Sequence, residues 1–506
     1  MAAMESNAEI GTALTSHEVS SITAASVPRQ DVQPVASSLG WSLLNNVLAR
    51  AGSIASGIVL ARLLAPTDYG LFAVALVVLS AVLSVNELGV SVAVVRWEHG
   101  VDRIAPTVVT ISMVSSGVFY LGCFLLAPAV ATALNGPEAV PLIRVLSLCV
   151  LVDGVAAVPA ALMTRAFAQR RRLVIDLMSF VAGTLISVGL AFAGYGSWAI
   201  VLGFLATNVI NGVSTVVAAP SRPRPGFSTD AARSLLEFGL PLAGASLLLF
   251  AMLNLDYIIV GHVLGAAALG FYLLAFNLSA MPVNLVSSAV RRVSLAAFAL
   301  MASQPQRAGD AFARSLGLVL LVTLPFCVLL ALYADDAISV VYGSKWLTSA
   351  SVVTWLCVLA AARLVLEISY DYLVAVGRSR SNFWLQFLWV ACLVPALYVG
   401  ARAGGVVGVA RGHAVVVSLV VLPVLLLILR RSHVPLLLLA RQCWPALIGS
   451  VVIWTSSLVV RHLELASLKE AAVGGVAGAA LYVIVVARHV RAVRRRGWAQ
   501  PEEQGG

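Results

Sequence analysis

Residues 40–72 read GWSLLNNVLARAGSIASGIVLARLLAPTDYGLF. Most of this stretch is apolar and is long enough for a membrane-spanning helix, yet Asn46 and Arg50 lie inside it. The helix is predicted to end at a tight connection, APTDYG at 65–70, which leads directly into a second apolar run. The stretch therefore predicts two consecutive helices in a membrane, the first with polar side chains that need a partner or a function.

A similar stretch follows 200 positions later. RLLAPTDYGLF at 62–72 aligns with HVLGAAALGFY at 262–272. A repeat at this distance indicates two structural halves. The position that aligns with Arg50 is Phe250, so the halves share a pattern but not this charge.

The composition excludes an ordinary soluble protein. Of the 506 residues, 60% are hydrophobic and 11% are charged, whereas about a quarter are charged in soluble domains. The apolar runs are long and do not alternate, which favours helices over a membrane β-barrel. We therefore predict an all-α polytopic membrane protein with about fourteen transmembrane helices, over residues 39–64, 70–95, 104–128, 138–164, 172–194, 197–219, 236–264, 268–290, 312–333, 349–376, 380–401, 405–429, 439–460 and 470–489.

The distribution of basic residues predicts the orientation. With both termini in the cytoplasm, 24 of the 33 Lys and Arg residues lie on the cytoplasmic side and 6 on the outer side, while Arg50, Arg144 and Arg363 lie within spans. This bias follows the positive-inside rule and supports the number and order of the spans. It also explains the net charge of +10 without nucleic acid as a partner.

The spans group into two six-helix lobes that are parallel repeats, related by a pseudo-twofold axis along the membrane normal. A Pro- and Arg-rich segment, APSRPRPGF at 219–227, lies between them. The predicted organisation is a disordered cytoplasmic N-terminus at 1–36, a first lobe at 37–219, a cytoplasmic linker at 220–235, a second lobe at 236–430, two additional helices at 431–490 and a disordered tail at 491–506.

No motif for catalysis or cofactor binding is present in the sequence. It contains no GxxxxGK[ST] loop, no HExxH and no GxSxG. The six cysteines lie in apolar runs without CxxC spacing and are interpreted as core residues. We expect no enzyme activity, no metal site and no cofactor.

Arg50 is the first candidate functional residue. A charge inside a membrane costs about 2.5–3.5 kcal/mol on insertion scales and is rarely present without a role. Asn46 and Ser53 lie one helical turn before and after it, which makes a polar stripe. The stripe suits a cavity that binds phosphate, whereas a structural ion pair with Glu87 is the alternative.

A second charged stripe lies in the predicted span 349–376. Arg363, Glu367 and Asp371 follow at steps of four residues and therefore share one helix face. Such a face cannot point to lipid. It either lines the same cavity or contains a self-neutralising Arg363–Glu367 pair.

Two further pairs are candidates for narrower roles. Asn254 and Asp256 lie in the first span of the second lobe, where Asp256 binds a coupling cation or proton, or pairs with an arginine. Arg291 and Arg292 end the next span at the cytoplasmic face, where they first bind the phosphates of a substrate or only fix the topology.

ARLLAPTDYGLF, followed by NELGVS at 86–91 and Arg96, resembles the start of the polysaccharide-transport flippases, the Wzx-type exporters of the multidrug/oligosaccharidyl-lipid/polysaccharide (MOP) superfamily. The start of the second lobe, GLPLAGASLLLFAMLNLDYIIVGHVLG at 239–265, is also similar to that family. In the family, the first helix ends in Arg-Leu-Leu-Gly-Pro, an acidic residue and Tyr-Gly. Here Ala65 replaces the glycine, while the other positions fit: Arg62, Leu63, Leu64, Pro66, Asp68, Tyr69 and Gly70.

The resemblance implies a V-shaped pair of lobes around a cationic cavity in the bacterial plasma membrane. It implies alternating access and a polyprenyl-(pyro)phosphate-linked oligosaccharide as the substrate. Membrane lipid, a polymerase and other polysaccharide-export proteins are the partners it suggests. A lipid II flippase, a drug/cation antiporter of the same superfamily and a membrane glycan polymerase are the alternatives.

Overall fold

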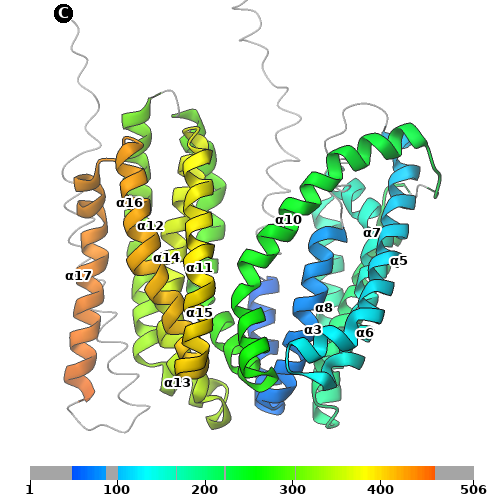
Figure 1. Ribbon diagram of the computed structural model, residues 1–506, viewed down its shortest axis with the longest axis horizontal. Helices are drawn as coiled ribbons and strands as arrows, with labels where there is room; N and C mark the ends of the chain where they lie inside the picture. Colours follow the sequence, from blue (N-terminus) through cyan, green and yellow to red (C-terminus); the bar gives the residue numbers. More distant parts are fainter. Residues whose placement is uncertain (1–47, 87–100, 167, 222–223, 302–303, 462–506) are drawn as a thin grey trace, which may run out of the picture.

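The computed structural model describes residues 48–86, 101–166, 168–221, 224–301 and 304–461, and all regular secondary structure in these ranges is helical. Figure 1 shows two groups of helices that lie side by side, with α10 crossing obliquely between them. The first lobe contains a helix over 48–63, α3 (Pro66–Asn86), α5 (Val101–Ala133), η1 (Pro137–Ala139), α6 (Val140–Leu146), α7 (Leu148–Arg165), α8 (Gln169–Phe192) and α9 (Ser197–Ala218). The rest of the chain contains α10 (Thr229–Leu264), α11 (Ala266–Leu300), α12 (Pro305–Leu332), α13 (Ala334–Val341), η2 (Ser344–Trp346), α14 (Thr348–Ala375), α15 (Ser379–Val416), η3 (Val417–Val421), α16 (Leu422–Arg431) and α17 (Leu436–Arg461).

The prediction of an all-α polytopic membrane protein is confirmed. Within the described residues, 11 helices are long and apolar enough to cross a membrane. The first predicted span is described only from residue 48, and the span predicted at 470–489 lies outside the described residues. The total of fourteen spans therefore stays a prediction.

The longest of these helices, 53 residues over Ser379–Arg431, contains two antiparallel legs. Gly404 and Gly405 have non-helical backbone angles, and the φ of +57° at Gly405 is one that side chains with a Cβ rarely adopt. The backbones of Gly400 and Gly408 lie against one another, because a Cβ on Gly400 would come within 2.3 Å of the Gly408 carbonyl oxygen. The chain therefore turns back here, between the spans predicted at 380–401 and 405–429.

Several helices extend beyond the predicted spans at the predicted cytoplasmic side. α11 has 35 residues, or about 50 Å of helix, against a hydrocarbon core of about 30 Å. α10 begins at Thr229, inside the predicted linker 220–235. Hydropathy misses such ends because they carry polar residues but keep helix-forming side chains.

The start of α10 lies on the first lobe. Thr110 of α5 donates a hydrogen bond to the carbonyl of Gly226 at 2.7 Å, and the amide of Ser228 donates to Thr107 at 3.1 Å. Leu235 is buried in a small core with α5 and α7. The part of α10 that precedes the predicted second lobe is thus docked on the first.

The repeated stretches meet where α3 and α11 begin. A Cβ on Gly70 would come within 1.7 Å of the carbonyl oxygen of Ala266, and a Cβ on Gly270 within 2.1 Å of that of Pro66. Adding 200 to the number of Gly70 and subtracting 200 from that of Ala266 gives Gly270 and Pro66, the residues of the second contact. This exchange is what a twofold relation requires. Close approach through small residues is typical of helix pairs in membranes. The two halves predicted from the sequence are therefore joined here by backbone contact.

A second contact at this end joins the helix over 48–63 to the segment 340–346 of the second lobe. The indole of Trp346 donates to the carbonyl of Ala61 at 2.8 Å, and Lys345 donates to the carbonyl of Leu64 at 2.7 Å. In the other direction, the guanidinium of Arg62 donates to the carbonyl of Val341 at 2.8 Å. These donors satisfy carbonyls that the end of a helix leaves without partners. We call this set of contacts the outer latch, because the predicted orientation puts it at the outer face.

We predict that Gly70→Ala destabilises the contact between the lobes. The new methyl group meets the Ala266 backbone, so the helices must separate, and overpacking of this kind costs about 1–3 kcal/mol. Thermal unfolding of the purified protein, followed by tryptophan fluorescence, measures the effect. Gly189→Ala is the control, because nothing lies within 4 Å of its Cβ position. An unchanged midpoint for Gly70→Ala would contradict the interpretation.

Candidate functional site

Arg50 lines a cavity between the two lobes, with a volume of about 230 Å³. Ser53, Ile54 and Gly57 line it from the same helix. Their spacing from Arg50 is three, four and seven residues, so they form one continuous face. The predicted polar stripe thus faces a cavity, as far as the described residues go; Asn46 and Glu87 lie outside them.

The opposite wall of this cavity belongs to the second lobe. It is formed by α11, through Leu274, Asn277, Leu278 and Met281, together with Tyr342. Tyr69 of the first lobe completes the lining, and its ring packs edge-on against Trp346 of the outer latch at 5.2 Å. The cavity therefore ends close to the latch, and its polar groups come from both lobes.

The arginine of this cavity forms no ion pair within the described part of the chain. A guanidinium offers five N–H donors in a planar arrangement that matches a phosphate or carboxylate. An anionic group that enters the cavity would meet this cation and the amide of Asn277 at one site.

The charges of α14 do not line this cavity. Arg363 and Glu367 form an ion pair at 3.8 Å, and their side chains are 30% and 26% exposed. The guanidinium also lies 5.6 Å from the centre of the Phe276 ring of α11. Asp371 is buried. The structure thus places Arg363 and Glu367 as a pair within the second lobe, apart from Arg50.

Asp256 is held by the second lobe as well. Its carboxylate accepts hydrogen bonds from the Tyr272 hydroxyl at 2.8 Å and from the Tyr257 amide at 3.0 Å. Asn254 donates to the Phe250 carbonyl of its own helix at 2.9 Å. Neither residue reaches the Arg50 cavity. Arg291 and Arg292 are in α11, but their side chains lie outside what the structure describes.

One buried polar group in the first lobe was missed by the sequence analysis. Asn86 donates to Asp153 of α7 at 3.0 Å and accepts from Ser116 of α5 at 2.9 Å. The signal was available, because Asp153 is a carboxylate in the middle of the predicted span 138–164. The two hydrogen bonds of Asn86 tie α3, α5 and α7 together near the end of α3 that is remote from Gly70.

Two solved membrane transporters share the fold of this chain, in which two lobes of membrane-spanning helices enclose a polar cavity. The lipid II flippase MurJ, in an inward closed conformation, superposes with a TM-score of 0.73 at 13% identity, over 90% of this chain and 99% of that one. A multidrug resistance MATE family transporter in an inward-facing conformation superposes with a TM-score of 0.59 at 17% identity, over 76% and 95%.

The chain belongs to the polysaccharide biosynthesis protein family, whose model matches residues 59–351. The succinoglycan biosynthesis transport protein ExoT of Rhizobium meliloti is 25% identical over 75% of this chain and 77% of its own. The lipopolysaccharide biosynthesis protein WzxC of Escherichia coli is 24% identical over 74% and 77%. The teichuronic acid biosynthesis protein TuaB of Bacillus subtilis is 22% identical over 66% and 69%. The Wzx-type resemblance predicted from the motif at 61–72 is confirmed.

We predict that Trp346→Ala loosens the outer latch. The change removes the hydrogen bond to Ala61 and the ring contact with Tyr69, and loss of a fully buried Trp costs about 3–5 kcal/mol. Hydrogen exchange of the amides at 61–72 should become faster. Trp444→Ala on α17 is the matched control, because that ring is exposed on the helix surface. Equal exchange in both variants would show that the latch does not hold this end.

Proposed function

We propose that the protein is a flippase for surface polysaccharide biosynthesis. It moves a polyprenyl-(pyro)phosphate-linked oligosaccharide from the cytoplasmic to the outer leaflet of the bacterial plasma membrane. The observation that carries the proposal is the position of Arg50 in a cavity between two lobes. The relatives support it, since they are named for the biosynthesis of three different surface polysaccharides.

The phosphates of the carrier are the part of the substrate that the cavity recognises. A cation in the membrane is costly unless it meets an anion, and a guanidinium binds phosphate through two parallel hydrogen bonds. The sugars need no such charge and pass with the phosphates through the polar part of the cavity. The hydrocarbon tail stays in contact with lipid throughout.

Transport proceeds by alternating access between the two lobes. In this conformation the lobes touch through Gly70, Gly270 and the outer latch. With both termini in the cytoplasm, this end is the outer end, so the described state is closed to the outside. Opening there requires the latch hydrogen bonds to break and the backbones of α3 and α11 to separate.

The other candidate residues predicted from the sequence have narrower roles in this proposal. Asp256, whose carboxylate is buried and accepts a hydrogen bond from Tyr272, is the site for a coupling ion. Arg291 and Arg292 first bind the phosphates at the cytoplasmic face. A polymerase and other polysaccharide-export proteins act on the substrate beside this protein.

A lipid II flippase is the second candidate, and the likeness to MurJ over 90% of the chain favours it. Both substrates carry a prenyl pyrophosphate, so the cavity does not distinguish them. Depletion of the cell's lipid II flippase provides the test. Rescue of cell-wall synthesis by this protein would establish the lipid II flippase. Failure to rescue would leave the flippase for surface polysaccharide biosynthesis.

We predict that Arg50→Ala lowers translocation of lipid-linked oligosaccharide in inverted membrane vesicles about tenfold or more. The variant loses a charge-assisted hydrogen bond to the phosphates, whereas Arg50→Lys keeps the charge and should retain part of the rate. Arg233→Ala is the control, because its side chain is 83% exposed and pairs with Glu237 at the start of α10. Full translocation by Arg50→Ala would refute the cavity assignment.

A further inference from the structure

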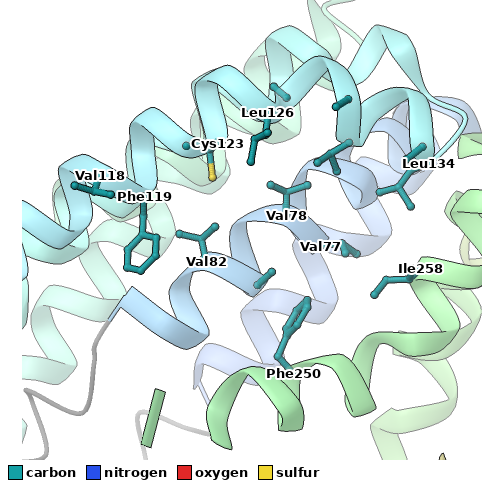
Figure 2. A pocket seen from close by; sticks show the side chains of 16 residues that line it. Val77, Val78, Val82, Val118, Phe119, Cys123, Leu126, Leu134, Phe250 and Ile258 are labelled. Carbon is teal, nitrogen blue, oxygen red and sulfur yellow. The ribbon is translucent and has the colours of Figure 1, made fainter. Parts of the chain in front are cut away.

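A second space between the lobes has the opposite chemistry. It is a groove of about 670 Å³ enclosed by α3, α5 and α10. Figure 2 shows Val77, Val78 and Val82 of α3 facing Phe119 and Leu126 of α5, with Phe250 and Ile258 of α10 on the remaining side. Among the described residues that line it, none has a charged side chain, a hydroxyl or a side-chain amide, and the one side-chain heteroatom is the sulfur of Cys123.

The groove and the Arg50 cavity are related by the repeat. Adding 200 to a residue of one half gives its counterpart in the other, so the seam between the helix over 48–63 and α11 corresponds to the seam between α10 and α3. Arg50 corresponds to Phe250, and Asn277 corresponds to Val77. The two seams therefore lie at equivalent depths, one with a cation and an amide and the other with hydrocarbon at the same positions.

The groove is continuous with the lipid-facing surface. Val118 and Leu126 belong to its lining, yet they are 63% and 60% exposed. Its α5 wall also includes Gly122, where nothing lies within 4 Å of the Cβ position, which leaves room for an occupant. In a bilayer such a groove is filled by hydrocarbon, and selectivity among chains comes from van der Waals fit rather than from water release.

We propose that this groove binds the polyisoprenoid chain of the lipid carrier while the phosphates of the same molecule lie at Arg50. This inference rests on the proposed function and adds the place of the tail. The substrate has a charged head and a hydrocarbon tail, and the two seams offer the two complementary surfaces on either side of one pseudo-twofold axis. The tail leaves the groove directly into the bilayer past Val118 and Leu126.

The experiment uses the full-length protein in phospholipid nanodiscs and a long-chain polyprenyl monophosphate with a photoreactive diazirine at the end remote from the phosphate. Cross-links in the wild type should map to α3, α5 and the 250–258 part of α10. Unlabelled polyprenyl phosphate should compete with the probe, and phosphatidylglycerol should not.

Gly122→Trp fills the groove and should lower cross-linking there about tenfold, because the indole takes the space of the chain. Gly117→Trp is the matched control. It lies on the same helix, also has nothing within 4 Å of its Cβ position, and does not line the groove. It should cross-link as the wild type does.

Four results would overturn the proposal. They are equal cross-linking by the two tryptophan variants, specific cross-links at the helix over 48–63 and α11 instead of the groove, equal competition by phosphatidylglycerol, and absence of any specific cross-link. None of them would refute the flippase function, which fails if the wild type does not translocate lipid-linked oligosaccharide in inverted membrane vesicles.

Discussion

The backbone contact between α3 and α11 is the constraint on which the rest of the structure depends. Gly70 and Gly270 leave no room for a side chain, so the two repeats meet along their main chains at the start of equivalent helices. A contact between equivalent positions fixes a twofold relation between the lobes, and that relation determines which helices face one another elsewhere. The first helix must then face α11, and α3 must face α10. Both spaces between the lobes follow from this pairing.

Within this symmetric frame, the side chains are not symmetric. A protein with identical halves would offer two equivalent seams, and an amphipathic molecule would have no reason to choose one orientation. Here Arg50 and Phe250 give the seams opposite polarity at the same depth. Gene duplication explains the shared helix pattern. The difference at this pair of positions makes one seam polar and the other apolar, so the two sides of the molecule differ within the plane of the membrane.

The sequence predicted the class of fold, because long apolar runs are a local pattern of hydropathy. The division into two lobes and the role of Arg50, which were inferred from a repeat and from one charge in a helix, stay predictions. The sequence left two alternatives open for Arg363, a cavity wall or an ion pair with Glu367, because the same i+4 stripe fits both. The structure shows the ion pair, with Phe276 of α11 beside the guanidinium. Asp153 in a predicted span signals a buried polar group, but the sequence does not show that Asn86 and Ser116 join it in a network across three helices. The start of α10 was placed too late, since helix ends outside the bilayer carry no hydropathy signal.

α10 begins on one lobe and ends in the other. Its first turns are buried against α5 and α7 through Leu235, while the carboxylate of Asp256, twenty-one residues later, is bonded to α11. Any rotation of the lobes must therefore be absorbed as a bend between these two anchors. Pro241 lies in that interval and lacks the amide that would stiffen the helix. If the lobes rock against one another, the resulting strain is concentrated in this single helix.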